Sequence, residues 1–507
     1  MRFRRAERPA ASGDVERSPA SFDVVVVTDL RFPGGTSSSL VDEIIAATDA
    51  GYRIGLVHLA NPRLGRSLPV HPGLRALLDE ARARLLLPGE PATGRLGMVK
   101  HPIVFAEWPG GRFPIEVERV LITVGQVPAD RHGAYYDPVA IDGSVTEAFG
   151  HAPLWAPVSG AVRATLSGVE LTDDDWVEVI DLHAWSPAPT IEATPRRAAG
   201  DEPDPRIVIG RHSRPDARKW PATADEIRAA YPADGSVRVR ILGGADAAEE
   251  LLGEVPEHWE VLPFGSISPQ EFLAGLDAFV YFHHPDLTEA FGRTILEAIA
   301  AGVPAVVPTH FEPLFGEACL YATPDTAIAT VSELVADPDA RQQHVQRARD
   351  IAERRFGHDA HVSRLAALIG SPTNDPGGSS LPPQLDLAPP GHRRSVATIM
   401  IAGLGIEREE IEQLLRSLDR QRRHVPGFVP ILVVTITRPP LADELGIETR
   451  SITSRRKWGD PSESWEVYAQ RRLRQLASHY RVDNITVADP SHPDAWIALQ
   501  MPPPSAG

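Results

Sequence analysis

The chain has 507 residues, of which 42% are apolar, with one cysteine and a formal net charge of −17. This length allows roughly three domains with full cores, and the negative charge argues against general nucleic-acid binding, which needs a basic stripe. The single cysteine, Cys319, excludes a disulfide framework and a cysteine-based zinc site. No stretch reaches the ~18 continuous apolar residues of a membrane-spanning helix. Residues 1–20 contain arginines but no apolar core, so we expect a disordered tail rather than a signal peptide.

Residues 21–198 are predicted to form a first α/β domain. Residues 22–27 are largely apolar, as in a strand of a buried parallel sheet. Gly34-Gly35-Thr36 follows, and then a helix whose apolar face recurs over residues 40–45. Further strands are predicted at residues 54–57, 102–106, 120–124 and 176–181.

Residues 201–369 are predicted to form a second α/β domain. Its strands alternate with helical patterns, which implies a parallel sheet. The predicted strands lie at residues 206–209, 237–242, 278–282 and 304–307.

The last part of the chain contains a linker and a further domain. Residues 371–390 are rich in Ser, Pro and Gly and are predicted to be the linker. Residues 395–500 show strands and helices of a smaller α/β domain, for which the sequence gives no role. Its Gly403-Leu404-Gly405 resembles a dinucleotide fingerprint, but Arg408 replaces the third glycine, so we do not expect NAD binding.

The most informative stretch is Thr288-Glu289-Ala290-Phe291-Gly292-Arg293-Thr294-Ile295-Leu296-Glu297-Ala298-Ile299-Ala300-Ala301-Gly302-Val303-Pro304. It follows an apolar strand and continues into a helix that Gly302 should end. Glu289 is therefore expected in a strand-to-helix loop, and Glu297 about one and a half turns into the helix. The helix N-terminus between the two carboxylates would suit a phosphate group.

This string resembles the donor-site motif of the retaining GT-B glycosyltransferases of the family 4 type, with Glu, seven residues, Glu and an intervening Phe-Gly. The resemblance implies two Rossmann-like domains facing a cleft and transfer of a hexose from a nucleotide-diphosphate sugar. Glu289 would hold sugar hydroxyls and Glu297 the ribose. Donor binding is also expected from Gly34, Gly35, Gly265, Phe291, Gly292 and Arg293.

The resemblance also assigns cations to the donor diphosphate. Arg211 and Lys219 match the Gly-Arg…Lys pair that clamps the diphosphate in this family, although their eight-residue spacing is longer than usual. Arg214 or Arg218 are alternatives to Lys219. Family members place a histidine or acid from the first domain near the transferred sugar, for which His132 is the candidate and His101 the second choice.

Two acidic or histidine-rich segments raise the question of a metal ion. His283 and His284 lie close to Asp286, but neighbouring side chains of an extended loop point apart. The run at residues 173–175 contains Asp-x-Asp and is predicted to be an acidic turn. We therefore expect neither a metal nor another cofactor, with the nucleotide sugar as a substrate.

The sequence thus predicts a retaining, metal-independent hexosyltransferase acting in the cytoplasm, with the inner face of the membrane as an alternative location. Its expected partners are a nucleotide-sugar donor and a glycan, lipid-linked or cell-envelope polysaccharide acceptor, without nucleic acid. A nucleotide-sugar epimerase on the same scaffold, and a non-catalytic sugar-nucleotide-binding or scaffold protein, remain as alternatives.

Overall fold

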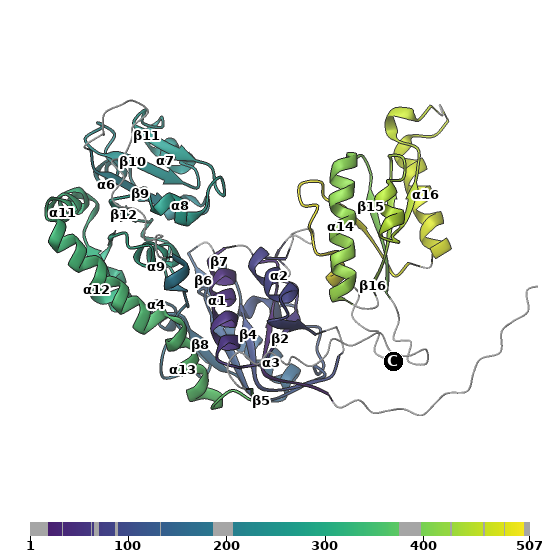
Figure 1. Ribbon diagram of the computed structural model, residues 1–507, viewed down its shortest axis with the longest axis horizontal. Helices are drawn as coiled ribbons and strands as arrows, with labels where there is room; N and C mark the ends of the chain where they lie inside the picture. Colours follow the sequence, from purple (N-terminus) through teal and green to yellow (C-terminus); the bar gives the residue numbers. More distant parts are fainter. Residues whose placement is uncertain are drawn as a thin grey trace, which may run out of the picture.

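The computed structural model describes residues 19–500, except 33, 62, 65–69, 87–89, 132, 186–205, 375–396, 426–427, 460–461 and 481. In this part the chain forms three parallel sheets and one short antiparallel pair (Figure 1). The predicted α/β class is therefore confirmed. The predicted tail up to residue 18, and residues 375–390 of the predicted linker, lie outside the described part.

The first sheet has the strand order β3-β2-β1-β4-β5-β8. Alternate residues of its central strand enter opposite cores, because successive side chains of a strand point to opposite faces. Val24 and Val26 pack in the core that contains α1, α2 and α13, whereas Val25 and Val27 pack in the core that contains α3. The elements are β1 (Ala20–Thr28), β2 (Ile54–His58), β3 (Ala83–Leu85), β4 (Ala92–Lys100), β5 (Ile115–Val124), β8 (Leu154–Pro157), α1 (Gly35–Asp49), α2 (Pro72–Asp79), α3 (Pro138–Phe149) and α4 (Gly160–Arg163).

Two predicted strands of this domain are wrong. Residues 102–106 contain a 3-10 helix, η1 (Pro102–Phe105), and residues 176–181 form no strand. The prediction missed three strands of this sheet, β3, β4 and β8, and of these β4 pairs with both β1 and β5.

The second sheet repeats the same topology, with the order β11-β10-β9-β12-β13-β14. Its core with α6 and α11 contains Ile209 and Val280, and its core with α8, α9 and α12 contains Val208 and Phe279. The elements are β9 (Val208–His212), η2 (Ala217–Lys219), α6 (Ala224–Ala230), β10 (Arg238–Leu242), α7 (Asp246–Leu252), β11 (Trp259–Leu262), α8 (Pro269–Leu273), β12 (Ala278–Val280), α9 (Arg293–Ala300), β13 (Ala305–Val307), η3 (Thr309–Phe311), α10 (Glu312–Phe315), η4 (Gly316–Ala318), β14 (Leu320–Tyr321), α11 (Pro324–Ala336) and α12 (Pro338–Phe356).

The two doubly wound domains meet at the carboxyl ends of their strands. Ser159, after β8, donates to the backbone carbonyl of Ala290, after β12. Arg218, after β9, donates to Asp130, after β5, at 2.9 Å. In open α/β sheets ligands bind outside the carboxyl ends of the strands, so this interface is where a site is expected.

Helix α13 (His358–Ile369) returns from the second domain to the first, where it packs against α1. Its Leu365 and Ile369 are buried in the first-domain core. Beyond the helix, the Tyr52 hydroxyl donates to Gly370 O at 2.8 Å, and the Thr373 hydroxyl donates to Asp23 at 2.9 Å. The first domain is therefore completed by residues up to Thr373.

The third sheet has the order β17-β16-β15-β18 and lies beside the first domain (Figure 1). Helix α14 covers one face and α16 the other. The elements are β15 (Ala397–Gly403), α14 (Arg408–His424), β16 (Phe428–Val434), α15 (Pro440–Glu444), β17 (Glu448–Ser451), η5 (Arg455–Lys457), α16 (Trp465–Tyr480) and β18 (Asn484–Val487). Among the described residues, no helix is both long and apolar enough to cross a membrane.

A chain that ends at Asn374 is expected to fold, whereas one that ends at Gly357 should be strongly destabilised. The shorter chain lacks Leu365 and Ile369, and burying each such side chain contributes roughly 1.5–3 kcal/mol. Urea unfolding followed by circular dichroism would measure the difference. Equal midpoints for the two truncated chains would contradict the role assigned to α13.

Candidate active site

Glu289 lies in the loop between β12 and α9, as predicted, and is the centre of a charged cluster. Its Oε2 accepts a hydrogen bond from the Tyr281 hydroxyl at 2.8 Å and forms an ion pair with Lys219 Nζ. Both charged side chains are largely buried, with exposed fractions of 13% and 14%. Burial opposes ionisation of Glu289, but the Lys219 ammonium and the Tyr281 hydroxyl outweigh it and hold the pKa of Glu289 below its usual value.

Two histidines stand beside this cluster. The Nε2 atoms of His283 and His310 lie 3.1 Å apart. His283 Nδ1 lies 2.8 Å from the backbone oxygen of His284, so it is assigned the proton that donates there. Burial lowers the pKa of both His283 and His310, which favours neutral rings at pH 7.

The residues considered as metal ligands turn toward different partners. His284 Nδ1 lies 2.7 Å from Asp286, which is also paired with Arg131, whereas His283 faces His310. Asp175 pairs with Arg163 at 2.7 Å. In the residues that the structure describes, no group of three or more His, Cys, Asp or Glu is arranged to hold a metal ion.

Arg211, which the resemblance assigned to the donor diphosphate, is buried among aromatic side chains in this structure. Its side chain is fully buried, with its guanidinium carbon 3.9 Å from the Trp220 ring centroid and within 6 Å of the Tyr231 and Tyr281 rings. It donates to the backbone oxygen of Lys219. A direct contact between Arg211 and a diphosphate is therefore at odds with this structure, in which Arg211 instead fixes the segment that carries Lys219.

Lys219 lies at the end of η2, and its neighbour Arg218 points elsewhere. Arg218 binds Asp216 through two nitrogens and also reaches Asp130 and Tyr135 of the first domain. Lys219, and not Arg218, is thus the cation beside Glu289.

The N-terminus of α9 begins at Gly292, which has a φ of 88° and provides no side-chain cap. This φ favours glycine, and a Cβ at Gly292 would also lie 2.9 Å from Ile295 Cδ1, which would have to shift. Phe291 is 2% exposed and packs on Phe315 and Phe356. A ligand at this helix end would meet backbone N–H groups rather than the Phe291 ring, so the predicted donor contact of Phe291 would involve its backbone.

Arg293 is turned toward the first domain. Its guanidinium donates to the backbone oxygen of Val179 and to Asp42 at 2.9 Å, and it lies 3.8 Å from Glu178. On its own helix it donates to Glu297 at 3.2 Å. The predicted donor ligand Arg293 therefore links the two domains in this structure.

Glu297 lies in the first turns of α9, as predicted, and is 8% exposed. Besides Arg293, its carboxylate lies 3.5 Å from His212 Nε2. Burial raises the pKa of Glu297 and lowers the pKa of His212 to about 3. His212 is thus a neutral ring next to the carboxylate.

The glycines predicted to bind the donor differ in their surroundings, and their donor contacts stay a prediction. Gly34 has a φ of 95° at the start of α1, and no atom lies within 4 Å of a Cβ added there. A Cβ at Gly35 would lie 3.0 Å from Arg293 Cβ and Cγ, so Gly35 is needed for the contact between α1 and α9. Gly265, with a φ of 76°, follows β11 and stands next to Phe264, whose side chain is 62% exposed.

His132 lies outside the described residues. The second choice, His101, directly follows β4 with φ 63° and ψ 95°, a conformation that a non-glycine residue rarely adopts. Its ring lies 4.0 Å from the Phe32 ring, and burial lowers its pKa to about 3. Such backbone strain is concentrated at functional sites.

Sequence reasoning missed Tyr281, His310, Asp42 and Glu178. Tyr281 follows the β12 strand directly, so its position at the carboxyl end of a parallel strand was a usable signal. The others reach the site from distant segments, and only the fold brings them there.

Replacing Glu178 by glutamine is expected to stabilise the protein at pH 8 and to have little effect at pH 5. Burial raises the pKa of Glu178 to about 7, against the opposing effect of Arg293. The protonated carboxyl of Glu178 therefore stabilises the folded state fully below the unfolded pKa of 4.5. This contribution is lost as the pH rises through about 7. At ~1.36 kcal/mol per pKa unit the gain reaches about 3 kcal/mol. Urea unfolding at both pH values would test this, with the exposed Glu170→Gln as the control, and a difference that does not depend on pH would contradict it.

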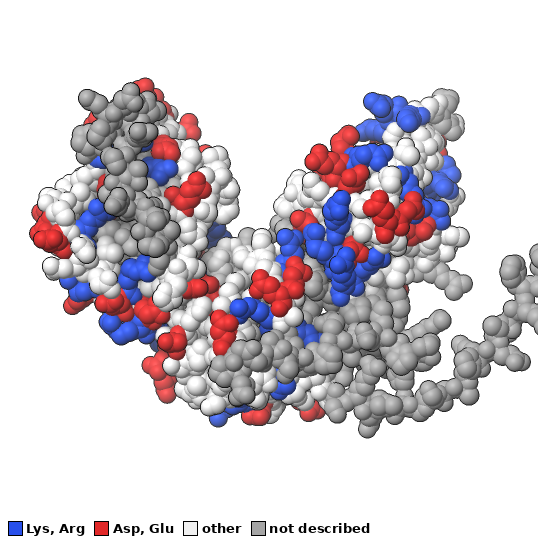
Figure 2. Space-filling view, viewed as in Figure 1, with Lys and Arg blue, Asp and Glu red and all other residues white. Residues whose placement is uncertain are grey.

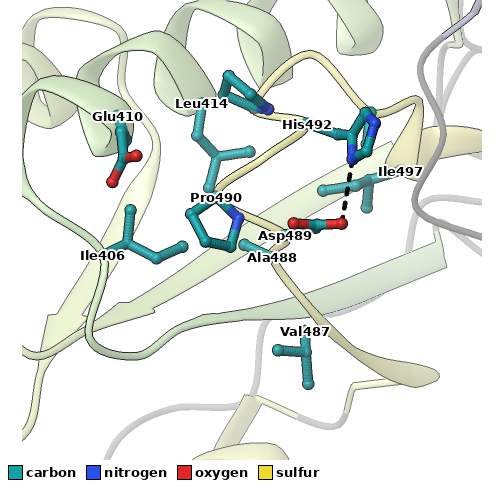
Figure 3. Close-up of a pocket in the computed structure, with 11 residues that line it drawn as sticks. Ile406, Glu410, Leu414, Val487, Ala488, Asp489, Pro490, His492 and Ile497 are labelled. Carbon is teal, nitrogen blue, oxygen red and sulfur yellow. Dashed lines mark hydrogen bonds and ion pairs between the residues drawn. The ribbon is translucent and has the colours of Figure 1, made fainter. Parts of the chain in front are cut away.

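A separate hollow lies in the third domain, at the carboxyl ends of β15 and β18 where the strand order reverses (Figure 3). In it, Asp489 Oδ2 lies 3.1 Å from His492 Nδ1, and Glu410 lies in the first turn of α14. Glu407 and Glu410 form a capping box at that helix start, and carboxylates there disfavour a pyrophosphate. The lining residues are Ile406, Glu410, Leu414, Val487, Ala488, Asp489, Pro490, His492, Pro493, Ala495 and Ile497.

No protein-family model matches the chain. No curated protein sequence matches it either. Among solved structures, it is similar to Anabaena Alr3699/HepE in complex with UDP-glucose, at 15% identity and a TM-score of 0.49 over 69% of this chain and 100% of the other. It is also similar to AviGT4, a glycosyltransferase involved in avilamycin A biosynthesis, at 15% identity and a TM-score of 0.42 over 69% and 97% of the chains. The OtsA apo structure is similar at 10% identity and a TM-score of 0.45, over 68% of this chain and 99% of the other.

Proposed function

We propose that the protein transfers a hexose from a nucleotide-diphosphate sugar to a hydroxyl acceptor. The observation that carries the proposal is the Lys219–Glu289–Tyr281 cluster beside the uncapped N-terminus of α9. It lies between the carboxyl ends of two doubly wound domains, where such folds bind nucleotides.

In this proposal the donor separates the ion pair between Lys219 and Glu289. Sugar hydroxyls would donate hydrogen bonds to the carboxylate of Glu289. The diphosphate would bind the ammonium of Lys219 and the N–H groups that follow Gly292. Once separated from Glu289, the Lys219 ammonium would face the diphosphate and could stabilise the charge that develops on the leaving phosphate. Arg211 would act from behind, through its hydrogen bond to the Lys219 backbone.

The remaining roles follow from position. Glu297 would bind the ribose, and a first-domain histidine, His101 or His132, would approach the transferred sugar. Retention of the anomeric configuration is proposed from the resemblance of the Glu289 motif. The acceptor would be a glycan, a lipid-linked saccharide or a cell-envelope polysaccharide.

The test is incubation of the full chain with a panel of nucleotide sugars, followed by detection of free nucleotide and of transferred sugar. The proposal expects release that depends on one donor and on an added saccharide acceptor. Formation of an epimer without transfer would favour the epimerase alternative. Binding without any turnover would favour the non-catalytic one.

Activity is expected to survive treatment with EDTA, because Lys219 and the α9 N-terminus would supply the positive charge that a metal ion provides elsewhere. The measurement compares the initial rate of untreated protein with that of protein that was treated with EDTA and then dialysed to remove it. Complete loss that Mg²⁺ or Mn²⁺ restores would contradict this, and would direct attention to residues 173–175 or to the pair His283 and His284.

A further inference from the structure

The third domain carries a basic face on its outer side. It consists of Arg455, Arg456 and Lys457 on η5 and of Arg471, Arg472 and Arg474 on α16. Between residues 451 and 480 these six cations stand against three acids, in a chain whose overall charge is −17. Figure 2 shows Lys and Arg side chains at the far end of the third domain and on the side that carries α16, besides a larger group over α14.

Two of the acids are paired within the basic face and leave a surplus of cations. Glu463 binds Arg471 at 2.8 Å, and Glu466 binds Arg455 at 3.0 Å. Arg456, Lys457 and Arg474 have no acidic partner among the described residues, and all three are exposed.

Aromatic side chains hold the basic face in shape. The Trp458 ring stacks on the Tyr468 ring with centroids 4.1 Å apart, and the Arg471 guanidinium lies 5.7 Å from the Tyr468 centroid. Trp458 Nε1 donates to the Glu463 backbone at 2.9 Å, and Trp465 Nε1 donates to the Thr453 backbone at 2.8 Å. The end of β17 and the start of α16 are thereby tied together.

An exposed apolar side chain lies among these cations. Val467 is 53% exposed and precedes Arg471 and Arg474 by four and seven residues, so the three share one face of α16. The opposite side of the helix packs on the third sheet through Ala469 and Leu473.

We propose that this basic face docks the protein onto an anionic lipid bilayer. Clustered Lys and Arg are attracted by the negative potential of such a surface. Trp and Tyr are enriched at membrane interfaces, and the half-buried rings of Trp458, Trp465 and Tyr468 belong to this face. Val467 would add apolar contact that a soluble polyanion could not use, which favours lipid over nucleic acid or an anionic glycan. The proposal is independent of the proposed glycosyl transfer, because vesicle binding requires no donor.

The test is flotation of the full chain with vesicles of phosphatidylcholine alone and of phosphatidylcholine with 30% phosphatidylglycerol. Binding is expected only to the anionic vesicles and should decline as NaCl screens the charges. The variant Arg455→Ser/Arg456→Ser/Lys457→Ser is expected to lose binding by roughly a hundredfold, since each cation near the surface contributes strongly. The matched control Arg347→Ser/Arg354→Ser/Arg355→Ser removes three exposed cations from α12 and should bind as the unchanged protein does.

Further variants separate the possible sources of binding. Val467→Ser should weaken binding several-fold, at salt concentrations where the charges are already screened. If Arg2→Ser/Arg4→Ser/Arg5→Ser abolishes vesicle binding while the η5 variant retains it, the N-terminal residues bind the lipid and the proposal is wrong. Equal loss in the η5 and α12 variants would show non-specific charge attraction and would also overturn it. So would binding to an oligonucleotide or an anionic polysaccharide without binding to vesicles.

Discussion

Replacing Glu289 by alanine is expected to lower kcat of the proposed transfer by about a hundredfold or more, with a smaller change in KM. The carboxylate orients the reacting sugar in the proposed site, and loss of such orientation is costly even where binding persists. The substitution also removes the partner of Lys219, whose side chain is 14% exposed. A nearly buried cation without its carboxylate should move, and it would no longer be held for the diphosphate.

The variant Glu289→Gln separates shape from charge. Glutamine can still accept the Tyr281 hydrogen bond of 2.8 Å but cannot neutralise Lys219. It should therefore keep more stability than alanine does and yet lose most of the turnover. The exposed acid Glu317, on the same domain, provides the control variant Glu317→Ala.

Steady-state rates with the identified donor, together with thermal unfolding of each variant, would measure both effects. Full activity in Glu289→Ala and Glu289→Gln, with folded protein in both cases, would remove Glu289 from the site. A loss of activity that merely follows a loss of folded protein would leave Glu289 with a structural role alone.

Local patterns were sufficient for much of the fold. The strands at residues 22–27, 54–57 and 278–282 were predictable because continuous apolar runs bounded by turn residues are typical of buried parallel strands. The loop position of Glu289 and the start of α9 were predictable for a similar reason, since Gly292 and Gly302 mark both ends of the apolar helix.

The strand β4 was missed because two glycines interrupt its apolar pattern. A Cβ at Gly94 would lie 3.1 Å from Val25 Cγ2, and one at Gly97 would lie 3.2 Å from Phe149 Cε1. The glycines thus admit side chains from a neighbouring strand and from α3. The sequence pattern shows that Gly94 and Gly97 lack side chains, but it does not show that Val25 and Phe149 occupy the space beside them.

The burial of Arg211 could not be predicted for a related reason. Its aromatic neighbours Trp220, Tyr231 and Tyr281 come from three separate segments. The sequence shows a cation after a strand, which fits both a ligand contact and a buried support. Only the packing of the second domain distinguishes between the two.

Replacing Arg293 by alanine is expected to destabilise the protein by about 3–5 kcal/mol, because it would leave buried carboxylates without their cation. Arg293 lies 2.9 Å from Asp42, 3.8 Å from Glu178 and within hydrogen-bond distance of Glu297, at 3.2 Å. Two of these partners belong to the first domain, so the loss should also loosen the contact between the two sheets. Arg293→Lys keeps the charge but not the planar fork, and should recover only part of the stability.

The same contact can be tested from the opposite side. A methyl group at Gly35 would press on Arg293 Cβ and Cγ at 3.0 Å, so Gly35→Ala should weaken the contact without changing any charge. Gly160→Ala is the matched control, since no atom lies within 4 Å of a Cβ there and Gly160 begins a helix. Small-angle scattering should show a larger radius of gyration for Gly35→Ala than for Gly160→Ala if the two domains separate.

The dependence on pH identifies the mechanism. Burial raises the pKa of Asp42 and Glu297, and it raises the pKa of Glu178 to about 7. At pH 5 Glu178 is protonated, and the loss of Arg293 leaves fewer uncompensated charges. At pH 8 Glu178 is ionised, so Arg293→Ala should cost more stability there than at pH 5. Urea unfolding of Arg293→Ala at the two pH values would measure this difference. A cost that is equal at both, or larger at pH 5, would mean that Arg293 acts through packing and its hydrogen bond to Val179 rather than by neutralising these acids.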